Sequence, residues 1–244
     1  MKLFTLGTSH GATEIGRVCS GNLVEVNGAY YLFDCGGSVE AKMTNHQLPI
    51  GEIKAVFISH MHEDHAGTLS SIAKRFIVYL NREKSVKMYL PEQNGIDAFQ
   101  NWLKALHLTP DEKIVSFFEV QAGEIYRDEN ITVTAIPTAH LGGGKFPSFA
   151  YVIEAQGKKL LYTGDLALDF HDYPEILFKE EFDTVLSELV HFDFEKNFET
   201  ILKTKTKRLI FTHMSLTKAE QVKEREAEFP FEVIIAEDDM CFEI

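Results

Sequence analysis

The chain has 244 residues, and its 37 Asp and Glu against 24 Lys and Arg give a net charge of −13. Apolar residues make up 45% and charged residues 25%, which argues against intrinsic disorder, and no apolar run approaches the roughly 18–20 residues of a membrane span. The three scattered cysteines, Cys19, Cys35 and Cys241, form neither a disulfide framework nor a CxxC motif, so we expect a reducing, cytoplasmic location.

The N-terminal part alternates strand signals with turns. Strands are predicted over residues 3–8, 22–26 and 29–34. The first of them lacks the long apolar region of an export signal. Asn27 and Gly28 predict a hairpin turn between the other two, because an Asn-Gly pair tolerates the positive φ angles of such turns. Ser38 is a candidate N-cap for a short helix that extends to Met43.

Apolar periodicity predicts the later elements. Further strands are expected over residues 53–59, 86–90, 114–120, 131–136, 149–155, 158–163, 184–189, 208–212 and 233–235. Helices are expected over residues 68–76, 95–106, 196–203 and 217–228. Early hairpins followed by alternating strands and helices indicate a mixed α/β layered fold. Because no linker or internal repeat interrupts the pattern, residues 1–244 are expected to form one domain.

One segment carries most of the chemical information. His60, His62, Asp64 and His65 fall within six residues, directly after a predicted buried strand. Imidazole and carboxylate groups are the usual nitrogen and oxygen ligands of zinc and similar ions. In an extended segment, residues two apart point the same way, so His60 and His62 can converge on one ion. Asp64 and His65 lie further along and can face a second ion.

Three more ligand-type side chains follow later strands. His140, Asp165 and His213 each come after an apolar strand and one or more small or hydroxyl residues. The ends of strands are where α/β folds place their sites. Alone, each residue would predict a cap or a loop position. Together with the histidine cluster, the three predict a binuclear metal site.

This series of residues resembles the ligand series of the metallo-β-lactamase superfamily, in order and over nearly the whole chain. The resemblance implies a four-layer αββα sandwich with metals at one edge between its two sheets. It implies one metal held by His60, His62 and His140, another held by Asp64, His65 and His213, and Asp165 bridging both. A carboxylate at position 165 resembles the phosphodiesterase and glyoxalase-type branches, since the dinuclear β-lactamases carry a cysteine there.

The N-terminus narrows the resemblance. Residues 6–11, Gly16-Arg17 and residues 31–36 are similar to the opening of ribonuclease Z and its phosphodiesterase relatives. That branch carries a Glu after a buried strand and a histidine proton donor, which implies catalytic roles for Glu188 and His191 beside Asp64. The usual His-Ser-Thr pattern of the branch is missing around His191.

A second difference from the ribonuclease Z pattern concerns the expected size of the substrate. Ribonuclease Z has a protruding basic insertion between its third histidine ligand and the bridging aspartate, but only 25 positions separate His140 from Asp165. Nucleic-acid binding also draws on Lys and Arg, which are in deficit here. We therefore expect a small anionic phosphodiester, linear or cyclic, and neither tRNA nor a membrane as partner.

These observations predict a metal-dependent hydrolase of the phosphodiesterase type. Two divalent ions, zinc or alternatively manganese, would share a hydroxide that attacks phosphorus. One alternative is a thioester or ester hydrolase of the glyoxalase type, with the same metals and a different electrophile. Another is a non-catalytic member of the fold that binds a ligand. A homodimer stays open as the assembly.

Several neighbouring residues have two interpretations. Asp34 could orient a ligand or form a turn, and the glycine-rich residues 141–145 could cover the pocket or serve as a plain turn. His10 and His171 could face the site or be structural. The same choice, between pocket wall and core, applies to the aromatic residues Phe146, Phe149, Phe170 and Phe192.

Overall fold

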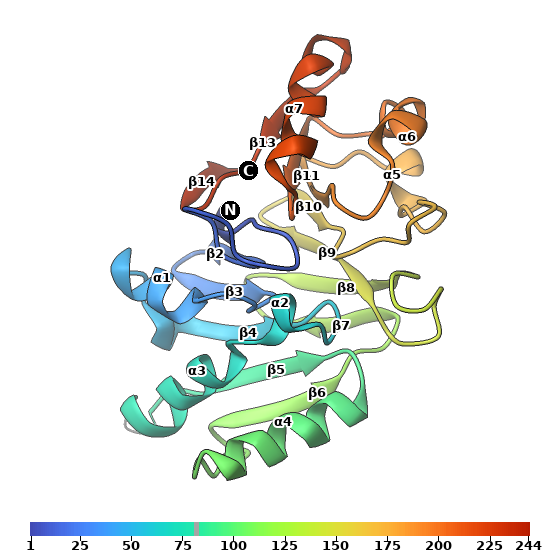
Figure 1. The fold of residues 1–244 in the computed structure, drawn as a ribbon. Coiled ribbons are helices and arrows are strands. Elements are labelled where there is room, and N and C mark those ends of the chain that lie inside the picture. The colour runs from blue at the N-terminus through green and yellow to red at the C-terminus, as the bar shows by residue number, and fades with distance from the viewer. Residues whose placement is uncertain (81–82) are drawn as a thin grey trace.

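The computed structural model describes residues 1–80 and 83–244, and it consists of two seven-stranded sheets with helices against their outer faces (Figure 1). One apolar layer lies between the two sheets, and one further layer lies between each sheet and the helices that cover it. The αββα sandwich predicted from the sequence is therefore confirmed.

The first sheet joins the N-terminal strands to the last strand of the chain. Its order is β14-β1-β2-β3-β4-β5-β6. These strands are β1 (Lys2–Gly7), β2 (Gly21–Val26), β3 (Ala29–Phe33), β4 (Ile53–Phe57), β5 (Val86–Leu90), β6 (Val115–Glu119) and β14 (Met240–Glu243). Asn27 and Gly28 have φ angles of 53° and 79°, so the predicted hairpin turn between β2 and β3 is confirmed.

The second sheet brings the ends of later strands to one edge. Its order is β13-β12-β11-β10-β9-β8-β7. These strands are β7 (Gly123–Arg127), β8 (Thr132–Pro137), β9 (Phe149–Ala155), β10 (Lys158–Tyr162), β11 (Thr184–Glu188), β12 (Arg208–Thr212) and β13 (Glu232–Ile235). The strands from β10 to β13 run parallel, so the residues that follow β10, β11 and β12 lie side by side.

Amphipathic helices close the outer layers. The helices are α1 (Val39–Asn45), α2 (Glu63–Ala66), α3 (Leu69–Lys74), α4 (Gln93–Ala105), α5 (Ile176–Lys179), α6 (Phe194–Ile201) and α7 (Leu216–Glu224). Buried side chains of α1, α3 and α4 pack on the first sheet, and those of α5, α6 and α7 pack on the second. Between the sheets, Phe57 stacks on Phe33 with ring centroids 4.9 Å apart.

Some local predictions were wrong. Ser38 has a φ of 48° and its side chain makes no capping hydrogen bond, so α1 begins without the predicted cap. The helix predicted to reach residue 228 ends at Glu224 and gives way to a 3-10 turn. Four short elements, β7, β14, α2 and α5, were not predicted. Most residues of β7 and β14 are not buried and so form no apolar run, and α2 and α5 are single turns of four residues.

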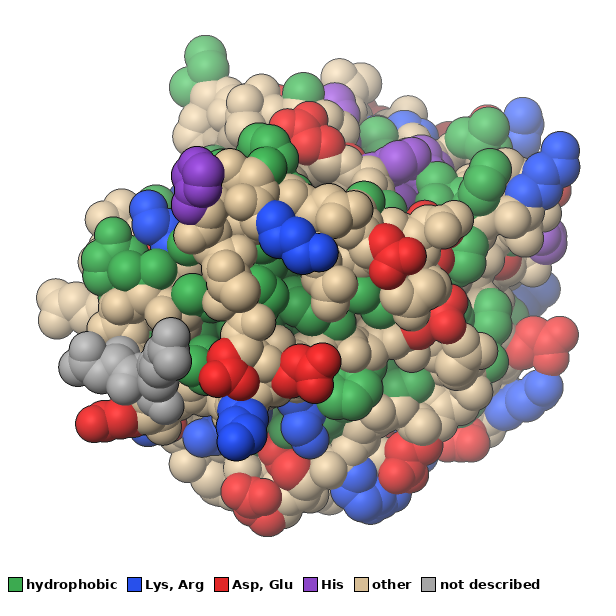
Figure 2. Space-filling model, turned by 90° about the horizontal axis from the view of Figure 1, so that it is seen from below, with side chains coloured by type: hydrophobic (Ala, Val, Ile, Leu, Met, Phe, Trp, Pro, Cys, Tyr) green, Lys and Arg blue, Asp and Glu red, His purple; other side chains and the backbone are tan. Residues whose placement is uncertain are grey.

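The helices and the surface charge are relevant to whether a membrane or a nucleic acid could be a partner. Among the described residues, no helix has the length and apolarity needed to cross a membrane. On the face seen in Figure 2, acidic and basic side chains are interspersed rather than gathered into a broad basic surface.

Asp183 ties β10 to the loop before β11. Its carboxylate accepts hydrogen bonds from the Lys159 amide at 3.0 Å, Lys158 Nζ at 3.1 Å and Lys207 Nζ at 2.8 Å. Burial raises the pKa of Asp183, but these donors outweigh it and lower the pKa to about 2.

We predict that Asp183→Asn lowers the free energy of unfolding by about 1 kcal/mol at pH 7, a value reduced because the lysines are solvent-exposed. Since the folded pKa lies below the unfolded one, this contribution is full above pH 4 and shrinks as the pH falls toward 2. Urea unfolding at pH 7, 4 and 3 tests it, with the exposed Glu181→Gln as control. A difference that does not change with pH would contradict it.

Candidate metal centre

Four separate segments of the chain place the predicted ligands at one edge between the two sheets. His60 and His62 lie in the loop after β4, and Asp64 and His65 lie in α2. His140, Asp165 and His213 follow β8, β10 and β12, respectively. The structure brings these seven side chains together into overlapping groups whose candidate ligand atoms lie within 4.8 Å of one another.

The first group is His60, His62 and His140, and it faces solvent. His60 Nε2 lies 3.0 Å from His62 Nδ1, and His140 Nε2 lies 3.4 Å from the same atom. His60 is fully buried, whereas His62 is exposed. A ligand from solvent can therefore reach this group past His62.

The second group is Asp64, His65 and His213, and it is buried. Asp64 Oδ2 lies 3.4 Å from His65 Nε2 and 3.8 Å from His213 Nε2. The two histidines are 0% and 1% exposed. This group forms the inner part of the centre.

Asp165 lies between the two groups. Its Oδ2 is 3.3 Å from His65 Nε2, 3.4 Å from His213 Nε2, 3.6 Å from His60 Nε2 and 3.7 Å from His140 Nε2. Within the described part of the chain, Asp165 Oδ1 and His65 Nε2 are buried without a hydrogen-bond partner. Because an unpaired buried polar atom is costly, these orphaned atoms fit a site built for cations.

Four of the histidines are held from behind. The Nδ1 atoms of His60, His65, His140 and His213 contact Ser59 Oγ, Asp34, the Leu166 carbonyl and Ser20 Oγ, in that order, at 2.7–3.2 Å. The Nε2 atoms then face Asp165. Metal-binding histidines are typically oriented in this way, through the ring nitrogen that does not contact the metal.

The charges of the centre favour ligand-ready side chains. Burial lowers the pKa of His60, His140 and His213 and so favours the neutral ring, the form that binds metal. Burial also opposes protonation of His65, but the Asp165 and Asp34 carboxylates outweigh it and raise its pKa well above the usual value. The carboxylates thus attract positive charge to this point.

Asp34 is the hub of the support. Its Oδ2 accepts hydrogen bonds from His65 Nδ1 at 2.7 Å, Tyr162 Oη at 2.6 Å and Ser59 Oγ at 2.8 Å, and its Oδ1 accepts one from the Ser59 amide at 2.7 Å. Because the only hydroxyl proton of Ser59 is donated to Asp34, Ser59 Oγ accepts from His60 Nδ1. Asp34 therefore orients two histidines at once.

Two glycines allow the backbone segments that carry the acidic ligands to pack close to the centre. A Cβ atom on Gly36 would lie 1.8 Å from the Asp64 carbonyl oxygen, so only glycine lets α2 approach β3 this closely. Gly164 has a φ of 55° and directly precedes Asp165. Both positions explain how the acidic ligands reach the centre.

Glu188 and His191 lie beside the centre. The Glu188 carboxylate is fully buried and accepts hydrogen bonds from His191 Nδ1 at 3.0 Å and from the amides of Leu166, Val190 and His191. The His191 ring lies over the His140 ring, with centroids 4.4 Å apart. Burial lowers the pKa of His191, but Glu188 outweighs this effect and raises it. Glu188 thus favours the protonated form of His191.

The other candidates contact residues that are not predicted ligands. His10 is 3.5 Å from Glu14, and His171 is bonded to Asp169 at the exposed surface. Phe149, Phe170 and Phe192 are buried in apolar layers. Phe146 is 58% exposed, in the loop that begins directly after His140.

The supporting residues were the hardest to predict. Asp34 had a signal, because it ends a strand in a turn motif. Ser20 had none, because its contact with His213 joins residues 193 positions apart.

Comparison with known proteins places these features in context. The family described as Anti-Pycsar protein Apyc1 matches residues 1–229. A ribonuclease Z of Methanocaldococcus jannaschii is 29% identical over 160 residues, which cover 63% of this chain and 47% of that protein. The chain spans about half the length of the curated relatives it matches.

Solved structures share the fold. The metallo-β-lactamase fold protein YhfI from Bacillus subtilis superposes with a TM-score of 0.79 at 20% identity, covering 99% of both chains. A diphosphatase from the PhnP family superposes with a TM-score of 0.77 at 17% identity, covering 100% of this chain and 97% of that one.

We predict that Asp34→Asn weakens the binding of divalent metal by 10–100-fold, because His65 and Ser59 lose their common acceptor, and lowers the free energy of unfolding by about 1–3 kcal/mol. Calorimetric titration with Zn²⁺ and urea unfolding measure the two effects. Asp128→Asn is the matched control, since Asp128 also accepts from tyrosine hydroxyls, those of Tyr31 and Tyr126, but in the described chain forms no hydrogen bond or ion pair with a predicted ligand. Equal metal affinity in the two variants would refute the role of Asp34.

Proposed function

Because the chain belongs to the family described as Anti-Pycsar protein Apyc1, in the ribonuclease Z-like branch of the metallo-β-lactamase superfamily, we propose that it is a metal-dependent hydrolase of a small or cyclic phosphodiester. The proposal assigns His60, His62 and His140 to one divalent ion, and Asp64, His65 and His213 to a second. Asp165 would be shared by the two. Zinc is the ion we expect, with manganese as the alternative.

The observation that carries the proposal is the shared orientation of the imidazoles. Four are held through Nδ1 by the protein, and their Nε2 atoms lie within 3.7 Å of one carboxylate oxygen of Asp165. A surface cluster of histidines would not need a partner behind each ring. Nitrogen and carboxylate donors in this number suit zinc and similar ions.

Two divalent ions held here would lower the pKa of a water shared between them and offset the negative charge that develops at phosphorus. The residues of the chain complete the reaction. The water oxygen would form the new bond to phosphorus and release its proton to solvent, while the bond from phosphorus to the leaving oxygen breaks. His191 donates the proton that the leaving oxygen takes up.

His191 suits this role because its two ring nitrogens have different surroundings. Nδ1 is bonded to Glu188, which fixes the ring, and Nε2 is then available to the substrate. The side chain is 25% exposed, so it lies at the rim rather than inside. A buried carboxylate behind a histidine is a general way to keep the histidine protonated for donation.

The surroundings of the centre support a small substrate. The positions between His140 and Asp165 are taken up by an exposed loop and the hairpin of β9 and β10. Nothing in that interval of the described chain extends as an arm for a large partner. Phe146 and Lys145 are exposed in the loop that begins after His140, and we propose them as an apolar and a cationic contact for an organic phosphate.

The names of similar proteins also support hydrolysis at phosphorus. Ribonuclease Z and a diphosphatase are names of enzymes that act on esters or anhydrides of phosphate. Their shared chemistry is nucleophilic attack at phosphorus, which two metal ions favour.

We predict about two ions per purified chain and metal-dependent hydrolysis of bis-p-nitrophenyl phosphate and of a cyclic phosphodiester. Asp64→Ala should lower kcat by more than about 100-fold while the fold is retained, because it removes a charged ligand from the inner group. Elemental analysis and a substrate panel with Zn²⁺ and Mn²⁺ provide the measurements. Asp169→Ala, at an exposed carboxylate of the neighbouring loop, is the matched control.

Other results of the panel discriminate the alternatives. Hydrolysis of a thioester but of no phosphodiester would replace the proposal with a glyoxalase-type activity. Cleavage of a tRNA precursor would replace the small substrate. A bound metal pair without turnover on any phosphodiester, ester or lactam would indicate a binding protein.

We predict that His191→Ala slows hydrolysis of an alkyl or cyclic phosphodiester by about 100–10,000-fold, because the alkoxide needs a proton as it leaves. The loss should be under about tenfold for a p-nitrophenyl ester, whose leaving group is stable without one. Glu188→Gln should show the same selectivity to a smaller degree. Equal losses on both substrates, or loss of metal from either variant, would rule out the proton-donor role.

A further inference from the structure

His213 has an unusual backbone for a residue with a side chain. Its φ of 45° lies in the left-handed region, directly after β12 ends at Thr212. A residue other than glycine in this region is strained, and such strain persists only where the surroundings impose it. The strain turns the ring toward Asp64 and Asp165.

The loop that follows β1 imposes this conformation from outside the strand. Met214, the next residue, donates its amide to the Thr8 carbonyl at 3.3 Å. Ser20 Oγ contacts His213 Nδ1 at 2.9 Å. Figure 1 shows this loop in dark blue between α2 and α7. Two contacts from the N-terminal loop thus hold the backbone at Met214 and the ring of His213.

Arg17 joins the two chain segments. Its guanidinium donates to the Met214 carbonyl at 2.8 Å through Nη1 and to the Thr8 carbonyl at 2.5 Å through Nη2. Nε donates to Thr8 Oγ1 at 3.0 Å, and Nη1 also contacts Glu14 at 2.9 Å. The side chain is only 10% exposed. A planar fork with several donors can span two carbonyls in this way, whereas a lysine cannot.

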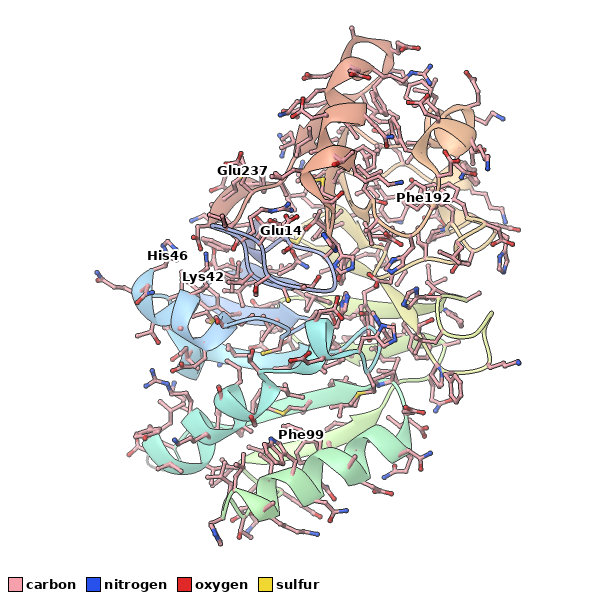
Figure 3. All side chains as sticks on the ribbon, viewed as in Figure 1. Glu14, Lys42, His46, Phe99, Phe192 and Glu237 are labelled. Atoms are coloured by element: carbon pink, nitrogen blue, oxygen red, sulfur yellow. The ribbon has the colours of Figure 1, made fainter. Side chains whose placement is uncertain are left out.

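The loop is itself anchored. Asp238 accepts from the Thr8 amide at 2.9 Å and from Thr8 Oγ1 at 2.8 Å, and Lys42 Nζ lies 3.1 Å from the same carboxylate. Figure 3 shows Lys42 of α1, Glu14 of the loop and Glu237 of the C-terminal segment on one side of the molecule. Arg17 therefore connects His213 to a fixed base.

We propose that Arg17 is a positioning residue for His213 and so sets the affinity of the inner metal group, Asp64, His65 and His213. This inference rests on the metal site of the proposed function. Without the fork, the backbone at Met214 relaxes and the His213 ring leaves the orientation that faces Asp64. The outer group, His60, His62 and His140, makes no contact with Arg17 in the described structure and keeps its geometry.

Zinc titration by calorimetry tests this split between the two groups. Arg17→Ala should weaken one binding event by tenfold or more and leave the other within about threefold, as for other partners that hold a ligand. Arg17→Lys, which can reach one carbonyl only, should give an intermediate loss. In a His140→Ala background, which weakens the outer group, the Arg17 change should act on the ion that remains. Addition of methylguanidinium should restore part of the affinity of Arg17→Ala.

Arg208→Ala is the matched control. Arg208 is the first residue of β12, the strand that precedes His213, and it bonds Glu232 at the end of that strand away from His213. It should leave both binding events unchanged. Equal weakening of both events in Arg17→Ala, or two unchanged events in a folded variant, would overturn the proposal. If Arg17→Ala fails to fold, Arg17→Lys and Ser20→Ala decide, and unchanged zinc binding in both would also overturn it. Absence of zinc binding in the wild type would instead contradict the proposed function itself.

Discussion

The neutralisation of three buried carboxylates governs this structure. Asp34, Asp64 and Asp165 lie at one edge between the sheets, and within the described chain no lysine or arginine forms an ion pair with them. Imidazoles lie close to all three, and Asp34 also accepts hydrogen bonds from Tyr162 and Ser59. The Asp165 and Asp34 carboxylates raise the pKa of His65, whereas burial lowers those of His60 and His213. Charge of this density in a low-dielectric setting requires cations, which is the physical basis of the proposed metal pair.

The fold serves this requirement through its topology. The parallel strands β10, β11 and β12 end side by side. Asp165 and His213 come after the ends of β10 and β12, and Glu188 is the last residue of β11. The other sheet contributes α2 after β4, brought close by Gly36. The centre therefore forms only when both sheets are folded and packed, so its geometry is tied to the core between them.

How much of this could be predicted depends on the range of the interaction. His60, His62 and His65 are local in sequence, and their spacing after an apolar strand was enough to identify them as ligand candidates. The Asn27-Gly28 hairpin and the central strands were equally local. The bond from Tyr162 to Asp34 spans 128 positions and that from Arg17 to Met214 spans 197, so no pattern in the sequence announces them. The edge strand β14 has one buried residue and so no apolar run, and it is held by pairing with β1.

Anomalous X-ray diffraction from crystals grown with Zn²⁺ tests the charge-neutralisation account most directly. The account predicts two anomalous peaks, one among His60, His62 and His140 and one among Asp64, His65 and His213, with Asp165 in contact with both. Crystals that show no peak at this edge of the sheets, or ions bound only elsewhere on the surface, would contradict it.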